Sequence, residues 1–369
     1  MIKEKCFTEE WLDSFKKQTE HRRIDKIILE KMIYAFHLLE QLKVNGLKFV
    51  FKGGTSLVLL LEEGNRFSID IDIICRADRM KLDGILEKVV KSSKFKSFRL
   101  DAQRSYKPGV PKAHYIFEFK SVTNVKYSGK LLLDVLIEDS IYPELVEKPI
   151  QTKWLETETP IMVTLPSVDS ITGDKLTAFA PNTIGIPYFK SDQSFAMEIC
   201  KQLFDLGKLF DRIENVEIVA RSFQLFAEQE IAYRKDSDSS LDLSPGKVLQ
   251  DTLNTCVILT IRGNRKEVQV KDNFRLLQDG VRALGTGFLM TGNFRIDDAV
   301  AAAARVAHLT AKLMVGDFSP IQLYQGQDIK ALNIQNQDWN YLNRLKRQPD
   351  NSLFYYWYHT VELLTKVKK

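Results

Sequence analysis

The spacing of hydrophobic residues predicts both helices and strands in the first part of the chain. Met32, Phe36 and Leu39 recur at helical spacing within residues 25–43, which indicates a helix facing a core. Further helices are expected over residues 8–20, 55–61 and 80–92, and strands over residues 47–52, 68–74, 95–100, 114–119, 131–137 and 160–165. Together these elements predict a mixed sheet of about five strands flanked by helices.

The pattern changes near Pro166, and almost all of the chain beyond it has helical periodicity. Helices are expected over residues 167–180, 192–212, 215–234, 246–261, 266–284, 296–314, 329–346 and 352–367. The predicted fold class is α+β, with a sheet-containing N-terminal domain followed by a mostly α-helical C-terminal region. We divide the chain into residues 1–165, 166–235 and 246–369, because the polar segment 235–247 is either a linker or a long surface loop.

Composition narrows the class of protein only slightly. The chain has 369 residues, of which 44% are hydrophobic and 27% charged, with a formal net charge of +5. These values predict folded cores, and the mild positive charge is as typical of an ordinary soluble protein as of one that binds nucleotides or RNA. The four cysteines are scattered, so we expect buried free thiols, a cytoplasmic protein and no membrane-spanning segment.

A glycine turn, Gly53-Gly54-Thr55-Ser56, follows the strand predicted over residues 47–52. Paired glycines let the backbone approach a phosphate closely, and the N-terminus of the following helix favours anions. Thr55 and Ser56 add hydroxyl groups. Taken alone, the segment is compatible with phosphate binding or with an ordinary turn, and it lacks the Gly-Lys-Ser/Thr ending of a P-loop.

Two aspartates lie close together in RFSIDID, residues 66–72. In a strand, Ser68, Asp70 and Asp72 share one face. Aspartate is disfavoured in strands, and two carboxylates on one face repel each other unless a cation lies between them. An exposed edge strand or a site for a divalent metal would explain this pattern, and the adjacent glycine turn favours the metal site. Arg66 either binds phosphate or caps the loop.

Asp134 is a third aspartate in a strand context, within the apolar run of residues 131–137. A lone carboxylate buried there without a partner would be costly. Asp134 is therefore either a third metal ligand beside Asp70 and Asp72 or a strand-end acid paired with a lysine such as Lys130.

These segments resemble the nucleotidyltransferase superfold of DNA polymerase beta, in which a glycine turn, Asp-x-Asp and a third Asp on a later strand form the site. More narrowly, GGTSLxxL followed by RFSIDIDI is similar to the AbiEii/AbiGii family of bacterial nucleotidyltransferase toxins. The Arg-x-Ser-x-Asp-x-Asp pattern of that family is matched by Arg66, Ser68, Asp70 and Asp72.

Two later segments resemble further motifs of the same family. Residues 174–178 (DKLTA) resemble its E-K-L-x-A helix with Asp in place of Glu, and residues 201–206 (KQLFDL) resemble its K-D-L-Y-D-L helix with Gln202 in place of the first Asp. The resemblance implies that Lys175 neutralises a triphosphate and that Asp205 orients Lys175 or the acceptor. From the residues alone, Lys175 is either a point charge that reaches the triphosphate or a solvated surface lysine. Asp205 either orients Lys175 or the acceptor, or is a surface acid paired with a neighbouring lysine.

The resemblance implies transfer of NMP from an NTP to an acceptor, with Mg²⁺ or Mn²⁺ held by Asp70, Asp72 and Asp134. The implied catalytic set is Asp70, Asp72, Asp134, Lys175 and Asp205, and the implied nucleotide-binding set is Gly53, Gly54, Thr55, Ser56, Arg66, Ser68 and Lys175. The implied acceptor is tRNA, another RNA or a protein. The implied role is that of a toxin in a type IV toxin–antitoxin or abortive-infection system for phage defence, with a possible cognate antitoxin.

Two other classes of function compete with this interpretation. The first is a catalytically degenerate module that binds nucleotide or a partner protein, and the second is an enzyme that modifies a small molecule such as an antibiotic. Three intact aspartates favour catalysis over the degenerate module. The five histidines have no metal-ligand spacing, so structural or surface roles are expected for them. The aromatic run of residues 354–358 either packs in a core or stacks on RNA bases.

Overall fold

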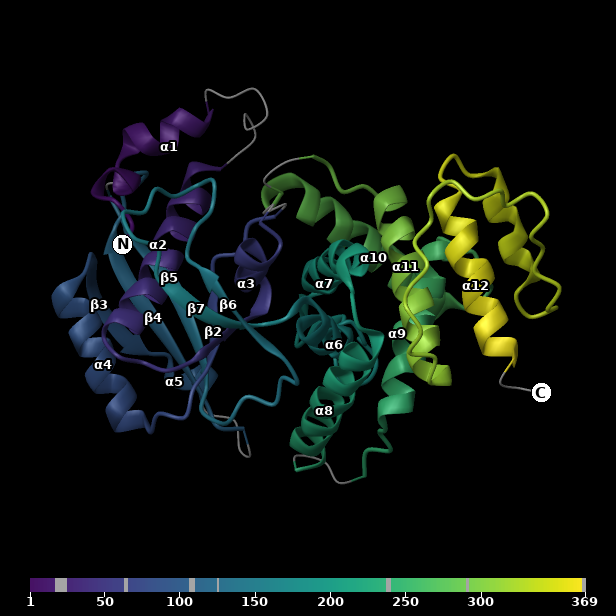
Figure 1. The fold of residues 1–369 in the computed structure, drawn as a ribbon, viewed down its shortest axis with the longest axis horizontal. Coiled ribbons are helices and arrows are strands. Elements are labelled where there is room, and N and C mark those ends of the chain that lie inside the picture. The colour runs from purple at the N-terminus through teal and green to yellow at the C-terminus, as the bar shows by residue number, and fades with distance from the viewer. Residues whose placement is uncertain are drawn as a thin grey trace. The chain divides into compact units, whose positions relative to one another are not determined.

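The computed structural model describes residues 1–16, 25–62, 66–105, 110–124, 126–236, 240–289 and 292–366. The chain forms two compact units (Figure 1). Unit 1 contains Met1–Ser167 together with Gly287–Asn293, and unit 2 contains Val168–Thr286 together with Phe294–Lys369.

Unit 1 is built on a seven-stranded mixed sheet with strand order β3-β4-β5-β2-β1-β7-β6. The strands are β1 (Val50–Lys52), β2 (Ile71–Ile74), β3 (Phe95–Leu100), β4 (Lys112–Lys120), β5 (Ser128–Leu136), β6 (Leu145–Pro149) and β7 (Met162–Pro166). β2 pairs with β5 and β1 with β7 in parallel, and the remaining pairs are antiparallel. The α-helices of this unit are α1 (Glu9–Lys16), α2 (Lys26–Val44), α3 (Gly53–Leu60), α4 (Arg79–Ser92) and α5 (Ala102–Ser105), and a 3-10 helix, Glu4–Phe7, precedes them.

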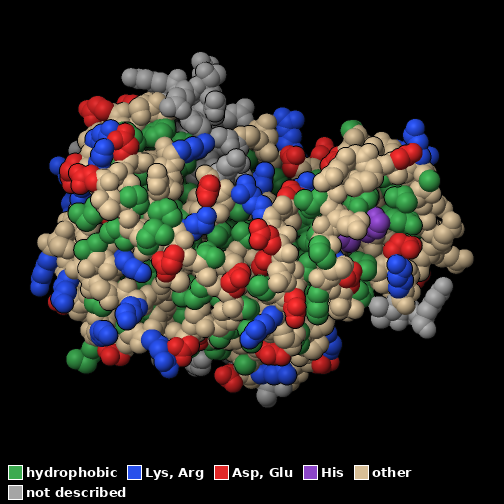
Figure 2. All heavy atoms as spheres, viewed as in Figure 1, with side chains coloured by type: hydrophobic (Ala, Val, Ile, Leu, Met, Phe, Trp, Pro, Cys, Tyr) green, Lys and Arg blue, Asp and Glu red, His purple; other side chains and the backbone are tan. Residues whose placement is uncertain are grey.

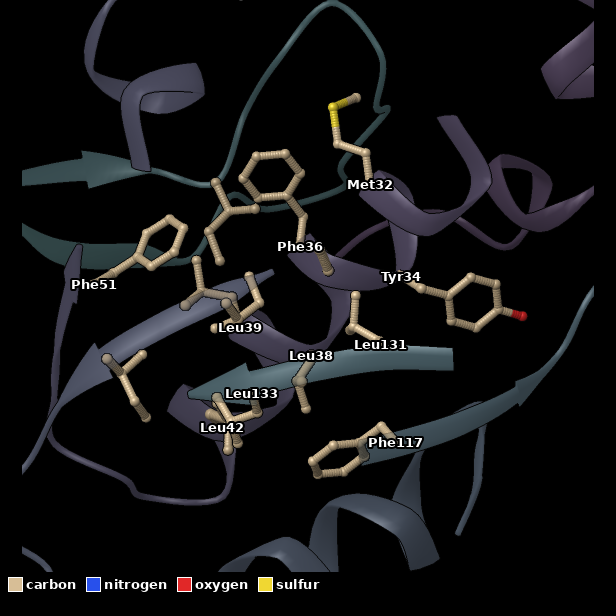
Figure 3. Packing of buried hydrophobic residues seen from close by; sticks show 14 of the residues in the cluster. Met32, Tyr34, Phe36, Leu38, Leu39, Leu42, Phe51, Phe117, Leu131 and Leu133 are labelled. Carbon is tan, nitrogen blue, oxygen red and sulfur yellow. The ribbon is translucent and has the colours of Figure 1, made fainter. Parts of the chain in front are cut away.

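The core of unit 1 lies between α2 and the central strands (Figure 3). Met32, Phe36 and Leu39 of α2 are fully buried, as the helical stripe predicts, and Leu131 and Leu133 of β5 lie in the same cluster. Because side chains alternate along a strand, the neighbours of these buried β5 residues point to the opposite face of the sheet. The face of β2 and β5 opposite α2 carries Asp72 and Asp134 together with apolar residues such as Ile74.

Unit 2 is helical, apart from a small hairpin formed by β8 (Phe189–Lys190) and β9 (Gln193–Ser194). Its α-helices are α6 (Val168–Ala178), α7 (Ala196–Leu209), α8 (Val216–Lys235), α9 (Pro245–Thr260), α10 (Val268–Gly287, whose last residue belongs to unit 1), α11 (Ile296–Val315) and α12 (Ser352–Lys366). α11 packs against α7, α9 and α12. Small residues allow this close packing, since a Cβ atom added to Gly207 would lie 2.8 Å from the Cβ of Ala302.

The α+β fold class predicted from the sequence is confirmed, and several elements differ from expectation, among them α5, β6 and the β8–β9 hairpin, which were not predicted. The sheet has seven strands, where about five were expected. The edge strand Leu145–Pro149 was not predicted, because it is polar and lacks the apolar alternation that indicates a strand in sequence. The helix expected over residues 329–346 is wrong, since only a 3-10 helix, Asn340–Arg347, forms there. The amide of Asn343 binds both backbone groups of Ile334 instead, which competes with helix formation.

Several other expected boundaries change in ways that affect the site. β2 begins at Ile71, so Asp70 precedes the strand instead of lying within it. Residues 17–20 of the first expected helix lie outside the described residues. The described parts of 168–235 and 246–369 lie in one unit, apart from the segment Gly287–Asn293, where the chain returns to unit 1.

Two general expectations can be compared directly with the described residues. All four cysteines are free and buried, as predicted. In the described part of the chain, no helix is both long and apolar enough to span a bilayer. Figure 2 shows lysine and arginine side chains interspersed with aspartate and glutamate on the viewed face.

Candidate active site

The glycine turn is packed directly against an aspartate. β1 ends at Lys52 and α3 begins at Gly53, whose φ of 76° lies in the left-handed region. A Cβ atom added to Gly53 would lie 2.1 Å from Oδ2 of Asp72, so a side chain at this position would have to displace the carboxylate. Glycine is therefore required for two independent reasons, the backbone conformation and the close approach.

The second glycine makes room for the side chains that precede β2. A Cβ atom added to Gly54 would lie 2.6 Å from Nη2 of Arg66 and 2.9 Å from Oγ of Ser68. Arg66 is buried and donates from Nη1 to the carbonyl of Phe67 over 3.3 Å. The backbone N–H of Phe67 donates to the carbonyl of Phe288 over 2.6 Å, which holds this segment in place through the short return of the chain to unit 1.

The two hydroxyl groups of the turn are oriented into the protein. Thr55 donates from Oγ1 to the carbonyl of Asp70 over 2.6 Å, and Ser56 donates from Oγ to the carbonyl of Gly53 over 2.8 Å. Both side chains are fully buried. What the turn offers to a ligand is therefore chiefly the N-terminal end of α3, where the N-cap residue Lys52 makes no side-chain cap.

Two of the three predicted carboxylates lie side by side on neighbouring strands. Asp72 of β2 is the register partner of Asp134 of β5 in a parallel pair, so both side chains lie on the same face of the sheet, opposite the buried Ile71 and Leu133. Asp70, one residue before β2, is exposed. Both Asp72 and Asp134 retain partial exposure, with 22% of the Asp134 side chain accessible.

A divalent cation fits this arrangement when a nucleotide supplies part of its coordination. Within the described residues, no three His, Cys, Asp or Glu side chains are placed together to hold a metal by themselves. Mg²⁺ commonly binds through one or two carboxylates, with water and substrate phosphates as the other ligands. Asp72 provides a carboxylate for the metal ion, and the N-terminus of α3 directly beside it provides N–H groups for the phosphates.

The structure adds two residues that the sequence interpretation did not include. Nδ1 of His114, on β4, lies 2.6 Å from Oδ1 of Asp134, and Nη2 of Arg104, on α5, lies 3.4 Å from Oδ2. His114 and Asp134 are register partners across the antiparallel pair of β4 and β5. The contact arises from the register of β4 against β5, which no local sequence pattern records.

Lys175 and Asp205 meet inside unit 2. Nζ of Lys175, on α6, lies 2.7 Å from Oδ2 of Asp205, on α7, and donates to Oε1 of Gln202 over 3.2 Å. The two charged side chains are only 6% and 2% exposed. This burial contradicts the interpretation of both residues as surface charges, and it shows that the two helical motifs found in the sequence pack against each other through their charged members.

The aromatic run near the C-terminus belongs to a core. Phe354, Tyr356 and Trp357 of α12 are at most 2% exposed, and Nε1 of Trp357 donates to the hydroxyl of Thr260 over 3.1 Å. These rings are therefore not available for stacking on RNA bases, and the core interpretation holds for them.

Paired glycines at a helix N-terminus, beside in-register carboxylates, form the kind of arrangement on which nucleotidyl and phosphoryl transfer depends. The family model described as nucleotidyl transferase AbiEii toxin of type IV toxin–antitoxin systems matches residues 37–283. The chain therefore belongs to the AbiEii family, and it is a nucleotidyltransferase of that family of toxins.

Two solved structures are similar to this chain at low sequence identity. One is MenT4, a nucleotidyltransferase toxin from Mycobacterium tuberculosis, with 14% identity, a TM-score of 0.45, and coverage of 85% of this chain and 99% of that one. The other is a protein from H. pylori described as a candidate nucleotidyltransferase, with 16% identity, a TM-score of 0.33, and coverage of 68% and 95%. The chain has no significant match among curated proteins. The family assignment rests on the family match alone.

Proposed function

We propose that the chain transfers a nucleoside monophosphate from an NTP to a hydroxyl group of an RNA, such as a tRNA 3′ end, or of a protein, and releases pyrophosphate. The observation that carries this proposal is the in-register pair Asp72 and Asp134 beside Gly53 at the start of α3. Family membership supports the class of reaction.

The residues of unit 1 divide the work of the reaction. Asp70 and Asp72 would hold Mg²⁺ or Mn²⁺ together with the phosphates, and the bound ion would neutralise charge on the triphosphate and lower the pKa of the acceptor hydroxyl. The N-terminal N–H groups of α3, beginning at Gly53 and Gly54, bind phosphate oxygens. Asp134 supplies the third carboxylate and takes the proton of the acceptor hydroxyl.

The bonds exchanged in this step balance without an oxidant or reductant. The acceptor oxygen gives its proton to Asp134 and forms a bond to the α-phosphorus. The bond between that phosphorus and the bridging oxygen breaks, and pyrophosphate leaves with the electron pair. Little covalent chemistry falls to the protein, so positioning and charge account for most of the rate enhancement.

We assign Lys175 and Asp205 to the same reaction as a lysine that neutralises phosphate charge and the acid that orients it. This assignment is supported by the family motifs in which they lie and by their ion pair within unit 2. Buried charges that are kept in pairs cost stability relative to apolar residues, so such a pair is a candidate for a functional role.

The toxin role implies a partner. Because the family consists of type IV toxins, we propose a cognate antitoxin encoded beside this chain. Coexpression with the neighbouring reading frame should relieve growth inhibition caused by the chain alone. Growth inhibition that persists with every adjacent frame would contradict this part of the proposal.

Label transfer tests the catalytic proposal directly. The full chain is incubated with Mg²⁺ and each α-labelled NTP, with total tRNA or cell lysate as acceptor, and the labelled product is identified. Asp72→Asn, which keeps the side-chain shape, should lower transfer by about 10³-fold, as expected for the loss of a main charge-stabilising group. Asp139→Asn is a matched control, because it removes a carboxylate of the same unit from an exposed ion pair with Arg76.

The outcome separates catalysis from binding. Equal labelling by Asp72→Asn and the parent would show that Asp72 is not catalytic. A parent chain that binds Mg²⁺ and NTP without transferring label to any acceptor would instead support a nucleotide-binding module.

A further inference from the structure

His114 holds the carboxylate of Asp134 more closely than any other side chain whose contact is described. The two atoms that meet, Nδ1 and Oδ1, are 2.6 Å apart, which is short for a hydrogen bond between a ring nitrogen and a carboxylate. The contact is built into the sheet, because the two residues are register partners on β4 and β5. Its geometry therefore depends on strand pairing and not on a mobile loop.

The chemistry of the contact fixes the position of one hydrogen. A carboxylate only accepts hydrogen bonds, so Nδ1 of His114 must carry the hydrogen that Oδ1 accepts. The opposite nitrogen, Nε2, is buried and has no hydrogen-bond partner within the described residues. A buried polar atom without a partner costs about 1–3 kcal/mol, and such atoms call for an explanation beyond packing.

The backbone around His114 is fixed as well. Its N–H donates to Oγ of Ser105 over 2.8 Å, and Oγ of Ser105 donates to the carbonyl of Asp101 over 2.7 Å. These bonds attach α5 to β4, so the element that carries Arg104 is held beside the same carboxylate. The imidazole is consequently confined in position, with only 11% of its side chain exposed.

Burial alone does not explain why Asp134 has this partner. Its side chain is 22% exposed, so water can reach it, and Arg104 already contributes a positive charge at Oδ2. An apolar residue at position 114 would avoid the unpaired Nε2. What the histidine adds is direction, because a donor fixed at Oδ1 selects one orientation of the carboxylate and leaves Oδ2 toward the partly exposed Arg104.

We propose that His114 is a positioning residue, which orients Asp134 so that Oδ2 accepts the proton of the acceptor hydroxyl. The inference rests on the proposed function, in which Asp134 is the proton acceptor. In this arrangement Arg104, whose side chain is 45% exposed, occupies Oδ2 until the acceptor arrives. His114 itself neither touches the substrate nor exchanges a proton with it.

Two substitutions at one position separate positioning from packing. His114→Asn places an amide N–H close to the position of Nδ1 and keeps the donor to Asp134, whereas His114→Leu keeps the bulk and removes the donor. Turnover of the full chain is measured with Mg²⁺, NTP and total tRNA, by release of pyrophosphate. We expect His114→Leu to lower kcat about 10- to 100-fold, in the range found for residues that orient a reactive group. His114→Asn should recover most of this loss.

Binding and folding are measured on the same variants. The dissociation constants of Mn²⁺ and of a non-hydrolysable NTP, measured by calorimetry, should stay within about twofold of the parent in both variants, because positioning acts on the proton transfer and not on nucleotide binding. Thermal unfolding shows whether each variant is folded. Parental kcat in folded His114→Leu, or equal loss in both folded variants, would overturn the proposal.

Nuclear magnetic resonance of ¹⁵N-histidine-labelled protein keeps this test distinct from that of the proposed function. The spectrum should show a hydrogen on Nδ1 of His114 in the parent, and Asp134→Asn should shift that resonance. If the parent transfers no nucleotide, the proposed function fails, and the positioning proposal fails with it. If the parent is active and Nδ1 carries no hydrogen, only the positioning proposal fails. Because these spectra are recorded on the parent and on Asp134→Asn, they test the positioning proposal even if His114→Leu does not fold.

Discussion

The sheet of unit 1 and the helices of unit 2 treat their charged residues in opposite ways. Asp72 and Asp134 lie on a sheet face, and 22% of the Asp134 side chain remains accessible. Lys175 and Asp205 pair between two helices, with side chains only 6% and 2% exposed. A sheet face can present charged groups to a ligand, whereas packed helices must neutralise them internally.

This difference changes what each pair can do. The carboxylates of unit 1 can exchange bound water or a neighbouring side chain for a metal ion or a substrate, with little cost in desolvation. Lys175 has already lost most of its water, and Asp205 compensates its charge. A phosphate can engage Lys175 only through the small part of the side chain that is exposed.

The largest effect is expected from breaking the buried ion pair of Lys175 and Asp205. Lys175→Met should lower the free energy of unfolding by about 3–5 kcal/mol, because it leaves the carboxylate of Asp205 buried without its partner. Urea unfolding measures this change. Lys201→Met is the control on the same helix as Asp205, since Lys201 forms a more exposed pair with Glu198 at 3.8 Å, and it should cost less than about 1 kcal/mol.

The double variant Lys175→Met with Asp205→Leu sharpens this prediction. Removing both charges also removes the unpaired group, so the double variant should be more stable than Lys175→Met alone. A double variant whose destabilisation equals the sum of the two single changes would show that Lys175 and Asp205 do not compensate each other's charge.

A smaller effect is expected at the open site, from adding one methyl group. Gly53→Ala would place Cβ 2.1 Å from Oδ2 of Asp72 and should lower kcat about 10²-fold by displacing the carboxylate. Gly46→Ala is a matched control, because Gly46 also has a positive φ, 86°, but has no atom within 4 Å of its added Cβ. Both variants carry the backbone cost of a positive φ, and only Gly53→Ala should lose label transfer. Equal activity in the two variants would remove the argument for close approach.

The smallest effect concerns another buried titratable group of unit 2, the imidazole of His308. Burial lowers the pKa of His308 to about 3, with the nearby His359 and Lys312 acting in the same direction. In the unfolded chain the imidazole binds a proton below its ordinary pKa of about 6.5, whereas the folded protein leaves it neutral until about pH 3. Stability is therefore complete above pH 6.5 and is lost as the pH falls, by about 2 kcal/mol at pH 5.

Urea unfolding at pH 7 and pH 5 measures this dependence. His308→Gln should reduce the difference between the two pH values by about 2 kcal/mol, because glutamine does not titrate. An unchanged difference would show that His308 is accessible to protons in the folded chain and would weaken the contrast between the two units.

The sequence singles out the local parts of the candidate site and not the parts that depend on the register of distant strands. Gly53, Asp70 and Asp72 could be singled out because they lie in two neighbouring short segments, residues 53–56 and 66–72, whose chemistry is unusual for a turn and a strand. His114 could not, because its role arises from the register of β4 against β5, which no local pattern records. Lys175 was recognised by its motif, but its burial depends on how α6 packs against α7.

The same distinction holds for the fold. Helices with clear apolar periodicity, such as α2, were predicted almost to the residue. The region of residues 329–346 also has apolar residues at helical spacing, yet the side chain of Asn343 binds the backbone of Ile334 and most of the region is not helical. Periodicity thus measures burial of one face, and it does not detect side chains that compete for backbone hydrogen bonds.

The return of the chain to unit 1 at Gly287–Asn293 has a consequence for biosynthesis. The N–H of Phe67, which shortly precedes Asp70 and Asp72, donates to the carbonyl of Phe288, a residue translated more than two hundred residues later. A ribosome that has finished the whole sheet has therefore not yet supplied every contact that holds Arg66 and Ser68 against the glycine turn. A nascent or truncated toxin ending at Ser167 would contain Asp70, Asp72 and Asp134 and still lack that support.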